Sequence, residues 1–197
     1  MFDAMTSELF DHFPPRRGRT HEATGPGAPG FAFALGGRLD GHVLWIVEGW
    51  RAGAINPVGF SLYLDPAKLL LARAGDPAEA QAVAEEALRS GAVALVVLEV
   101  SKPLSLTAGR RLQLAAEEGK STGLCLISEG MGSNAAQTRW HCSPLYDPDD
   151  STLQRWETIK NKSGTLKAWD VRWDAQTRRI IVVSKAGERS GVAGPAG

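Results

Sequence analysis

The stretch from Ala74 to Val100 constrains the fold more than any other part of the chain, because it joins a capped helix to a strand of buried character. Asp76 can accept hydrogen bonds from the first free N–H groups of a helix, Pro77 suits its first position, and Glu79 can complete a capping box. Apolar residues then recur at helical spacing as far as Gly91, a residue type that ends helices in the left-handed conformation.

The residues that follow Gly91, Ala92 to Val100, are apolar except for Glu99. An unbroken, β-branched run of this kind is typical of a central parallel strand that is covered on both faces. A helix that leads into such a strand is half of a βαβ unit. The sequence therefore predicts an α/β fold with a mainly parallel central sheet flanked by helices.

Charge and composition restrict the function classes. The 197 residues have a net charge of zero, but residues 1–150 carry 13 basic and 18 acidic side chains, whereas residues 151–197 carry 9 basic and 4 acidic ones. A basic carboxyl-terminal part is compatible with a nucleic-acid partner, an acidic partner or a solvated surface. Two cysteines and the lack of a membrane-length apolar stretch or a signal-peptide pattern predict a cytoplasmic protein with no membrane contact.

The remaining elements follow from hydrophobic patterning. Residues 1–20 are expected to form an amino-terminal arm with a short helix over 4–12, residues 21–185 a single domain, and residues 186–197 a flexible tail. After Thr152 the pattern changes to alternation, which predicts antiparallel carboxyl-terminal strands with one wet face. The expected helices are 31–39 and 104–119, the latter ending at Gly119, and the expected strands are 42–47, 68–72, 122–128, 138–143 at a sheet edge, 153–159, 169–174 and 179–183.

A glycine-rich turn lies between a short extended segment and a helix, which is where phosphate-binding loops occur. Gly25 and Gly30 have the spacing of such a loop, and Gly27 lies between them. The next two positions should carry a lysine for the phosphates and a hydroxyl for magnesium, but they are Phe31 and Ala32. The loop is therefore interpreted as a degenerate phosphate loop with no expected nucleotide cofactor, and a plain glycine turn remains an alternative.

Two acids follow apolar strands and are candidates for a vestigial site. Glu48 and Glu99 each end a predicted strand, where α/β proteins bind ligands and where a nucleotidase carboxylate reaches magnesium. Solvated turn residues are the simpler interpretation. His141, Cys142 and Cys125 have no metal-ligand spacing and are expected to be surface or core residues, so no metal site is predicted.

These pieces together resemble the core of RecA-type recombinases. The closest stretch runs from Asp65 to Glu99, with Glu99 at the family's magnesium-site acid. Residues 25–32 resemble the family's phosphate loop, and Ile159 to Lys162 resembles its lysine-asparagine-lysine turn, which in RecA-like filaments reaches a neighbouring subunit's nucleotide. The chain departs from the pattern at Phe31 and Ala32 and lacks room for the first DNA-binding loop, while 129–136 remains where the second would lie.

A reduced RecA relative with these departures resembles the family of inducible mutagenesis protein A (ImuA), also described as SulA-like. The resemblance implies a non-catalytic accessory protein of damage-induced, error-prone translesion synthesis. Its implied partners are an ImuB-like Y-family polymerase homologue and, directly or indirectly, an error-prone polymerase III alpha-type subunit; single-stranded DNA and a second copy of the chain are further candidates. The candidate contacts for a partner or DNA are Arg139, Lys160, Lys162 and Arg172.

Three other functions stay open at this point. A weak ATP-dependent DNA-binding RecA paralogue would use Glu48 or Glu99 with the lysine turn. A SulA-like inhibitor of cell division is a second alternative. Direct binding of single-stranded DNA is a third, in which Trp140 and Trp156 stack on bases while basic side chains follow the phosphates.

Overall fold

The computed structural model describes residues 13–49 and 55–186, and the predicted helix over 4–12 and most of the predicted tail lie outside this part. The described elements alternate strands and helices before a run of strands, as the sequence predicts. In chain order they are β1 Thr20–Thr24, α2 Ala28–Arg38, β2 Val43–Glu48, α3 Pro57–Phe60, the 3-10 turn η1 Pro66–Lys68, β3 Leu69–Ala74, α4 Pro77–Ser90, β4 Leu95–Glu99, α5 Leu106–Gly119, β5 Thr122–Leu126, β6 Thr138–Pro144, β7 Gln154–Asn161, β8 Ala168–Asp174 and β9 Arg179–Ala186.

The strands of the described part form one mixed sheet in the order β3-β2-β4-β5-β1-β6-β7-β8-β9. Neighbours from β3 to β6 are parallel, and β6 to β9 are antiparallel. The predicted α/β class, with a parallel core and antiparallel carboxyl-terminal strands, is therefore confirmed. The edge position predicted for residues 138–143 is wrong, because β6 pairs with β1 on one side and with β7 on the other.

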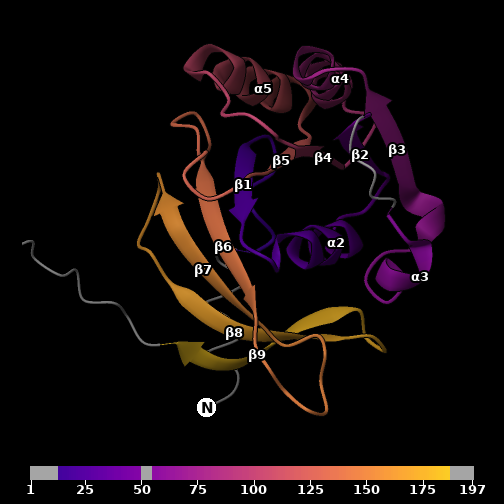
Figure 1. The fold of residues 1–197 in the computed structure, drawn as a ribbon, viewed down its shortest axis with the longest axis vertical. Helices are drawn as coiled ribbons and strands as arrows, with labels where there is room; N and C mark the ends of the chain where they lie inside the picture. The colour runs from indigo at the N-terminus through magenta and orange to yellow at the C-terminus, as the bar shows by residue number, and fades with distance from the viewer. Residues whose placement is uncertain (1–12, 50–54, 187–197) are drawn as a thin grey trace, which may run out of the picture.

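Helices cover both faces of the parallel part (Figure 1). One core cluster packs α4 and α5 on one face through side chains such as Leu88 and Leu112. The other cluster contains α2 and α3 together with inward side chains of the antiparallel strands, among them Trp156, Trp169 and Trp173. The sheet curls so that β8 and β9 lie on the far side of α2 from the parallel strands (Figure 1). Helix α2 is thus enclosed by the two parts of one sheet.

The capped helix that the sequence predicts is α4. Asp76 Oδ1 accepts hydrogen bonds from the backbone N–H groups of Ala78 and Glu79 at 2.8 and 2.9 Å. The Glu79 carboxylate reaches one residue further back than in a capping box and accepts from the Gly75 N–H at 2.6 Å. Gly91 ends the helix with φ +67°. Strand β4 follows, and its first four residues are buried.

Helix α5 ends at Gly119, as predicted, but Gly119 is not the left-handed residue that stops it. Gly119 is its last helical residue, and Lys120 takes the left-handed conformation with φ 52°. The glycine is needed for a different reason, since a Cβ at position 119 would overlap the carbonyl oxygen of Leu88 in the neighbouring helix α4. Close packing of the two helices, rather than the backbone angle, therefore explains this glycine.

The described part of the predicted amino-terminal arm, residues 13–19, lies against the domain. Phe13 is fully buried and contacts Phe31 and Trp156, with ring centroids 5.6 and 5.0 Å apart. The Gly18 N–H donates to the carbonyl of Ser121 at 3.0 Å. These contacts place the basic residues that follow Pro15 in a fixed position beside β1.

Candidate functional site

The glycine-rich turn joins β1 to α2, as predicted, but the chain itself fills the space in front of it. Gly25 has φ +87°, and a Cβ there would lie 2.5 Å from the carbonyl oxygen of Cys142 in β6. The Gly27 N–H donates to this same oxygen at 2.9 Å. The side-chain amide of Gln154, in β7, packs against Gly27 and Gly30. The Cys142 carbonyl of β6 and the Gln154 side chain of β7 thus pack directly against the glycines of this turn.

The two residues at the lysine and hydroxyl positions belong to the core. Phe31 and Ala32 are 0% and 1% exposed. The Phe31 ring lies between Phe13, Trp140 and Trp156, with centroid distances of 5.6, 5.2 and 4.7 Å. An aromatic side chain at this position therefore joins α2 to the arm and to the antiparallel strands, which a lysine could not do.

The two acids at the strand ends lie close to each other but not to a large cavity. Glu48 is buried and accepts a hydrogen bond from the Ser101 hydroxyl at 2.6 Å. Glu99 accepts one from the Trp45 indole N–H at 2.8 Å. Both line a cavity of about 10 Å³, which is room for one water molecule at most. Their observed contacts are structural, since each carboxylate satisfies a donor of a neighbouring element.

Three of the four basic candidates come together, and each is bonded within the chain. Arg139 Nε donates to the buried carboxylate of Glu22 at 2.7 Å. Lys160 Nζ donates to the carbonyl of Ser133, and Lys162 Nζ to that of Ala135, both at 2.8 Å. These three cations hold the loop between β5 and β6, which corresponds to the predicted DNA-binding segment 129–136.

Electrostatics at this cluster follow from its burial. Desolvation lowers the pKa of Lys160, and the positive charges of Lys162 and Arg139 lower it further, while the Glu22 carboxylate acts in the opposite direction. Glu22 is 1% exposed and also accepts a hydrogen bond from the Ser133 N–H at 2.6 Å. A buried acid with two strong donors is the centre of this cluster, and the sequence analysis did not assign it a role.

The fourth basic candidate, Arg172, lies elsewhere. It is exposed on the outward face of β8, next to Ile181 of β9. The strand register pairs Arg139 with Lys160 at the end of β7, whereas Gln154 at its beginning pairs with Val171. The two ends of β7 are roughly 20 Å apart at about 3.3 Å per residue. Arg172 therefore belongs to a different surface.

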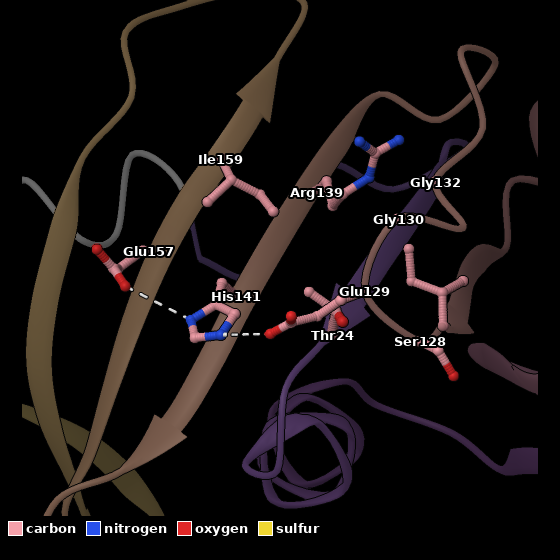
Figure 2. Close-up of a pocket in the computed structure, with 10 residues that line it drawn as sticks. Thr24, Ser128, Glu129, Gly130, Gly132, Arg139, His141, Glu157 and Ile159 are labelled. Carbon is pink, nitrogen blue, oxygen red and sulfur yellow. Dashed lines mark ion pairs between the residues drawn. The ribbon is translucent and has the colours of Figure 1, made fainter. Parts of the chain in front are cut away.

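The described residues contain a pocket of about 370 Å³ at the carboxyl ends of β1 and β5 (Figure 2). His141 projects into it from β6, with Nδ1 3.5 Å from a Glu157 carboxylate oxygen and Nε2 3.6 Å from one of Glu129. Ile127 and Ile159 supply apolar walls, and Arg139 lines one end. The position is the edge at which α/β proteins bind ligands.

Glu157 and Glu129, the partners of His141, were not among the residues predicted from the sequence. The alternating pattern of residues 153–159 does place Glu157 on the wet face, but the register that sets it opposite His141 comes from the sheet. Glu129 comes from a loop, where no periodicity exists to place a side chain. The pocket is thus formed by residues that are distant in sequence.

The aromatic and sulfur candidates are core residues. Trp140 and Trp156 are 0% and 2% exposed, so base stacking on them, as the single-strand hypothesis requires, is excluded in this structure. Burial and the nearby Glu22 carboxylate raise the pKa of the Cys125 thiol to about 12, and burial and Glu157 raise that of Cys142. Both thiols behave as small apolar groups. In the described part of the chain, His, Cys, Asp and Glu side chains form no cluster that could hold a metal ion.

None of the helices described here is both long and apolar enough to cross a bilayer.

Comparison with known proteins gives a clear relative. Protein ImuA of Caulobacter vibrioides, in strains NA1000 / CB15N and ATCC 19089 / CIP 103742 / CB 15, is 34% identical over 182 residues, which cover 77% of this chain and 73% of the relative. No family model matches the chain. At this identity and coverage, the chain belongs to the ImuA family.

Proposed function

We propose that this chain is a non-catalytic accessory protein of damage-induced, error-prone translesion DNA synthesis that works in the cytoplasm as an interaction module. Membership of the ImuA family supports a role in inducible mutagenesis. Its expected partner is an ImuB-like Y-family polymerase homologue, through which it reaches an error-prone replicative-type polymerase subunit.

The packing of other residues against the glycine loop is the observation that supports a non-catalytic role. The Cys142 carbonyl and the Gln154 amide lie against its glycines, and Phe31, at the position of the phosphate-binding lysine, is fully buried. Without the lysine charge and the hydroxyl, such a loop lacks the groups that bind the β- and γ-phosphates and magnesium. In this proposal the RecA-like sheet provides surfaces that bind partner proteins and does not provide a catalytic site.

The outward face of the antiparallel strands is the surface proposed for the polymerase partner. It presents Arg172 of β8 together with Val183 of the neighbouring strand β9, which is 49% exposed. Exposed aliphatic side chains beside a cation are common in protein interfaces. Deleting residues 151–197 would not test this surface, because it would remove Trp156, Trp169 and Trp173 from the core.

The test uses a strain that lacks the chromosomal gene and carries the full-length chain on a plasmid. We expect damage-induced mutation frequency to fall in the deletion and to return with the wild-type chain. The double variant Arg172→Glu/Val183→Glu should fail to restore it and should lose the ImuB-like partner in a pull-down. Leu114→Glu, at an exposed position of α5 on the other face, is the matched control.

Normal mutagenesis in the deletion strain would refute the proposed role. Full activity and partner binding of the double variant would refute the proposed surface while leaving the role intact. ATP hydrolysis that depends on Glu99 would favour the enzymatic alternative instead.

A further inference from the structure

A basic groove lies at the end of the molecule opposite the pocket of Figure 2. It has a volume of about 290 Å³ and is lined by Arg16, Arg17, Gly18, Arg19, Glu117 and Lys120. Arg19 directly precedes β1 and Lys120 lies two residues before β5, and these two strands are parallel neighbours. We call it the amino-edge groove, because it lies where these strands begin rather than where they end.

The backbone of the groove is fixed by contacts from several elements. The buried His21 ring donates from Nε2 to the carbonyl of Arg16 at 2.9 Å. Arg17 Nε donates to the carbonyl of Lys120 at 2.6 Å, which joins the two sides of the groove. Gly18, with φ +71°, turns the chain just after Arg17, and its N–H donates a hydrogen bond to the carbonyl of Ser121. The basic side chains therefore project from an ordered segment.

The groove carries an excess of positive charge. Arg19 is paired with Glu117, with an N–O distance of 3.0 Å. Arg16, Arg17 and Lys120 have no carboxylate partner in the described part of the chain, and Glu118, the nearest acid in sequence, is paired with Arg89. The lining thus has three uncompensated cations, and Arg16, Arg17 and Lys120 are all exposed.

The character of the lining indicates which anion fits. Every side chain that lines the groove is charged, and glycine supplies the rest, so there is no aromatic or aliphatic side chain to anchor a peptide. Protein interfaces depend on such apolar anchors at their centres. Contacts to a nucleic-acid backbone instead consist mainly of hydrogen bonds and ion pairs from arginine and lysine to phosphate oxygens.

We propose that the amino-edge groove binds the phosphodiester backbone of a nucleic acid. Arg16, Arg17 and Lys120 donate to phosphate oxygens, and Arg19 contributes to the positive potential while Glu117 holds it in place. None of these residues is among the candidates assigned from the sequence. The proposal does not depend on the polymerase partner, because the groove is complete within this chain.

The test is fluorescence anisotropy with the purified full-length chain and end-labelled oligothymidylate, with a duplex of equal length as a second arm. Each phosphate neutralised on a single strand contributes roughly −0.7 to the slope of log K against log salt, so three contacts predict a slope of about −2. Arg16→Glu/Arg17→Glu should weaken binding at low salt at least tenfold and reduce the slope to about −0.7, since only the Lys120 contact remains. Comparing the affinities for oligothymidylate and for the duplex shows whether the groove prefers single-stranded or double-stranded nucleic acid.

Arg179→Glu is the matched control, because it makes the same change at an exposed arginine that begins β9, far from the groove, and should leave the affinity unchanged. Arg16→Ala/Lys120→Ala is the second variant, which keeps the test valid if the double glutamate variant fails to fold by circular dichroism. Absence of salt-dependent binding to either nucleic acid would overturn the proposal. So would equal weakening by Arg179→Glu, or competition by polyglutamate at the same concentration of charge.

Discussion

His21 shows how one buried side chain can fix both a strand and the segment before it. Its ring is fully buried, with Nδ1 2.7 Å from the Thr138 hydroxyl and Nε2 2.9 Å from the Arg16 carbonyl. The Arg16 carbonyl can only accept, so Nε2 carries the proton. In the neutral ring Nδ1 then accepts from the Thr138 hydroxyl, whose oxygen in turn accepts from the Trp140 indole N–H. Protonation would place a second N–H against that hydroxyl and bury a charge.

We therefore predict that stability falls in mild acid. Burial lowers the pKa of His21 from 6.5 to about 4, with the hydrogen bond to Arg16 acting against the shift. Between these values the unfolded chain binds the proton and the folded chain does not, so the contribution is complete above pH 6.5 and is lost as the pH falls towards 4. At 1.36 kcal/mol per pKa unit, it amounts to about 3 kcal/mol.

Urea denaturation of wild type and His21→Gln across this pH range measures the effect. The glutamine variant should be less stable at neutral pH, and its free energy of unfolding should depend less on pH. Equal pH dependence in the two proteins would show that carboxylates elsewhere, not His21, dominate the acid response.

Phe31 is the second residue whose environment decides its role. It is in contact with three aromatic rings from the arm, β6 and β7. Restoring the phosphate-loop lysine by Phe31→Lys would remove these contacts and bury an ammonium group. We expect a loss of at least about 4 kcal/mol in the free energy of unfolding.

Urea denaturation followed by tryptophan fluorescence checks this loss. Leu114→Lys makes the same type of change at a site that is 64% exposed, and should alter stability by less than about 0.5 kcal/mol. A Phe31→Lys variant as stable as wild type would mean that the space around position 31 can accept a charge, contrary to the packing described here.

At the scale of elements, the loop between β5 and β6 has its conformation fixed by contacts with the neighbouring strands. Glu22 of β1 accepts from Ser133 and Arg139, and Lys160 and Lys162 donate to carbonyls of the same loop. The basic side chains that the sequence suggested for binding a partner are thus used to join β1, β6 and β7. Because Arg139, Lys160 and Lys162 already donate hydrogen bonds within the chain, fewer of their N–H groups are available to bind a ligand.

Glu22→Gln tests this arrangement. Removing one member of a buried ion pair leaves the charge of Arg139 uncompensated, which should cost about 3 kcal/mol of stability. Amide hydrogen exchange of the loop around Ser133 should become faster. Asp170→Asn, which breaks the more exposed pair with Arg155, is the control and should cost about 1 kcal/mol or less. Unchanged exchange in Glu22→Gln would indicate that the loop is held by other contacts.

At the scale of the whole molecule, the two edges of the parallel part of the sheet differ in character. The carboxyl edge holds the glycine loop, whose space is filled by β6 and β7, and beside it the pocket around His141. The amino edge holds the groove of uncompensated cations. Helix α2, enclosed by the curled sheet, connects the glycine loop to the aromatic core.

The sequence predicts the local features well, because their causes are local. Asp76, Pro77 and Gly91 define α4 through capping and backbone preference, and the run of apolar residues after it identifies β4 as a central strand. The glycine loop was recognised from its spacing. The absence of its lysine and hydroxyl was read directly from Phe31 and Ala32.

The arrangement of the site was not predictable in the same way, since it depends on long-range pairing. Arg139 and Glu22 are 117 residues apart in the chain, and no periodicity indicates that they meet. The internal position of β6 was missed because alternation reveals a wet face but not the number of neighbouring strands. The order of residues 16–19 depends on His21 and Lys120, which the sequence does not connect to them.

Titration calorimetry of the full-length chain with ATP and Mg²⁺ at millimolar concentration tests the central claim most directly. Since the Cys142 carbonyl and Gln154 pack against the glycine turn, and the buried Phe31 stands where a phosphate loop carries its lysine, we predict no saturable heat of binding. Saturable binding that is abolished by Glu99→Ala would contradict this account and would assign the chain a working nucleotide site.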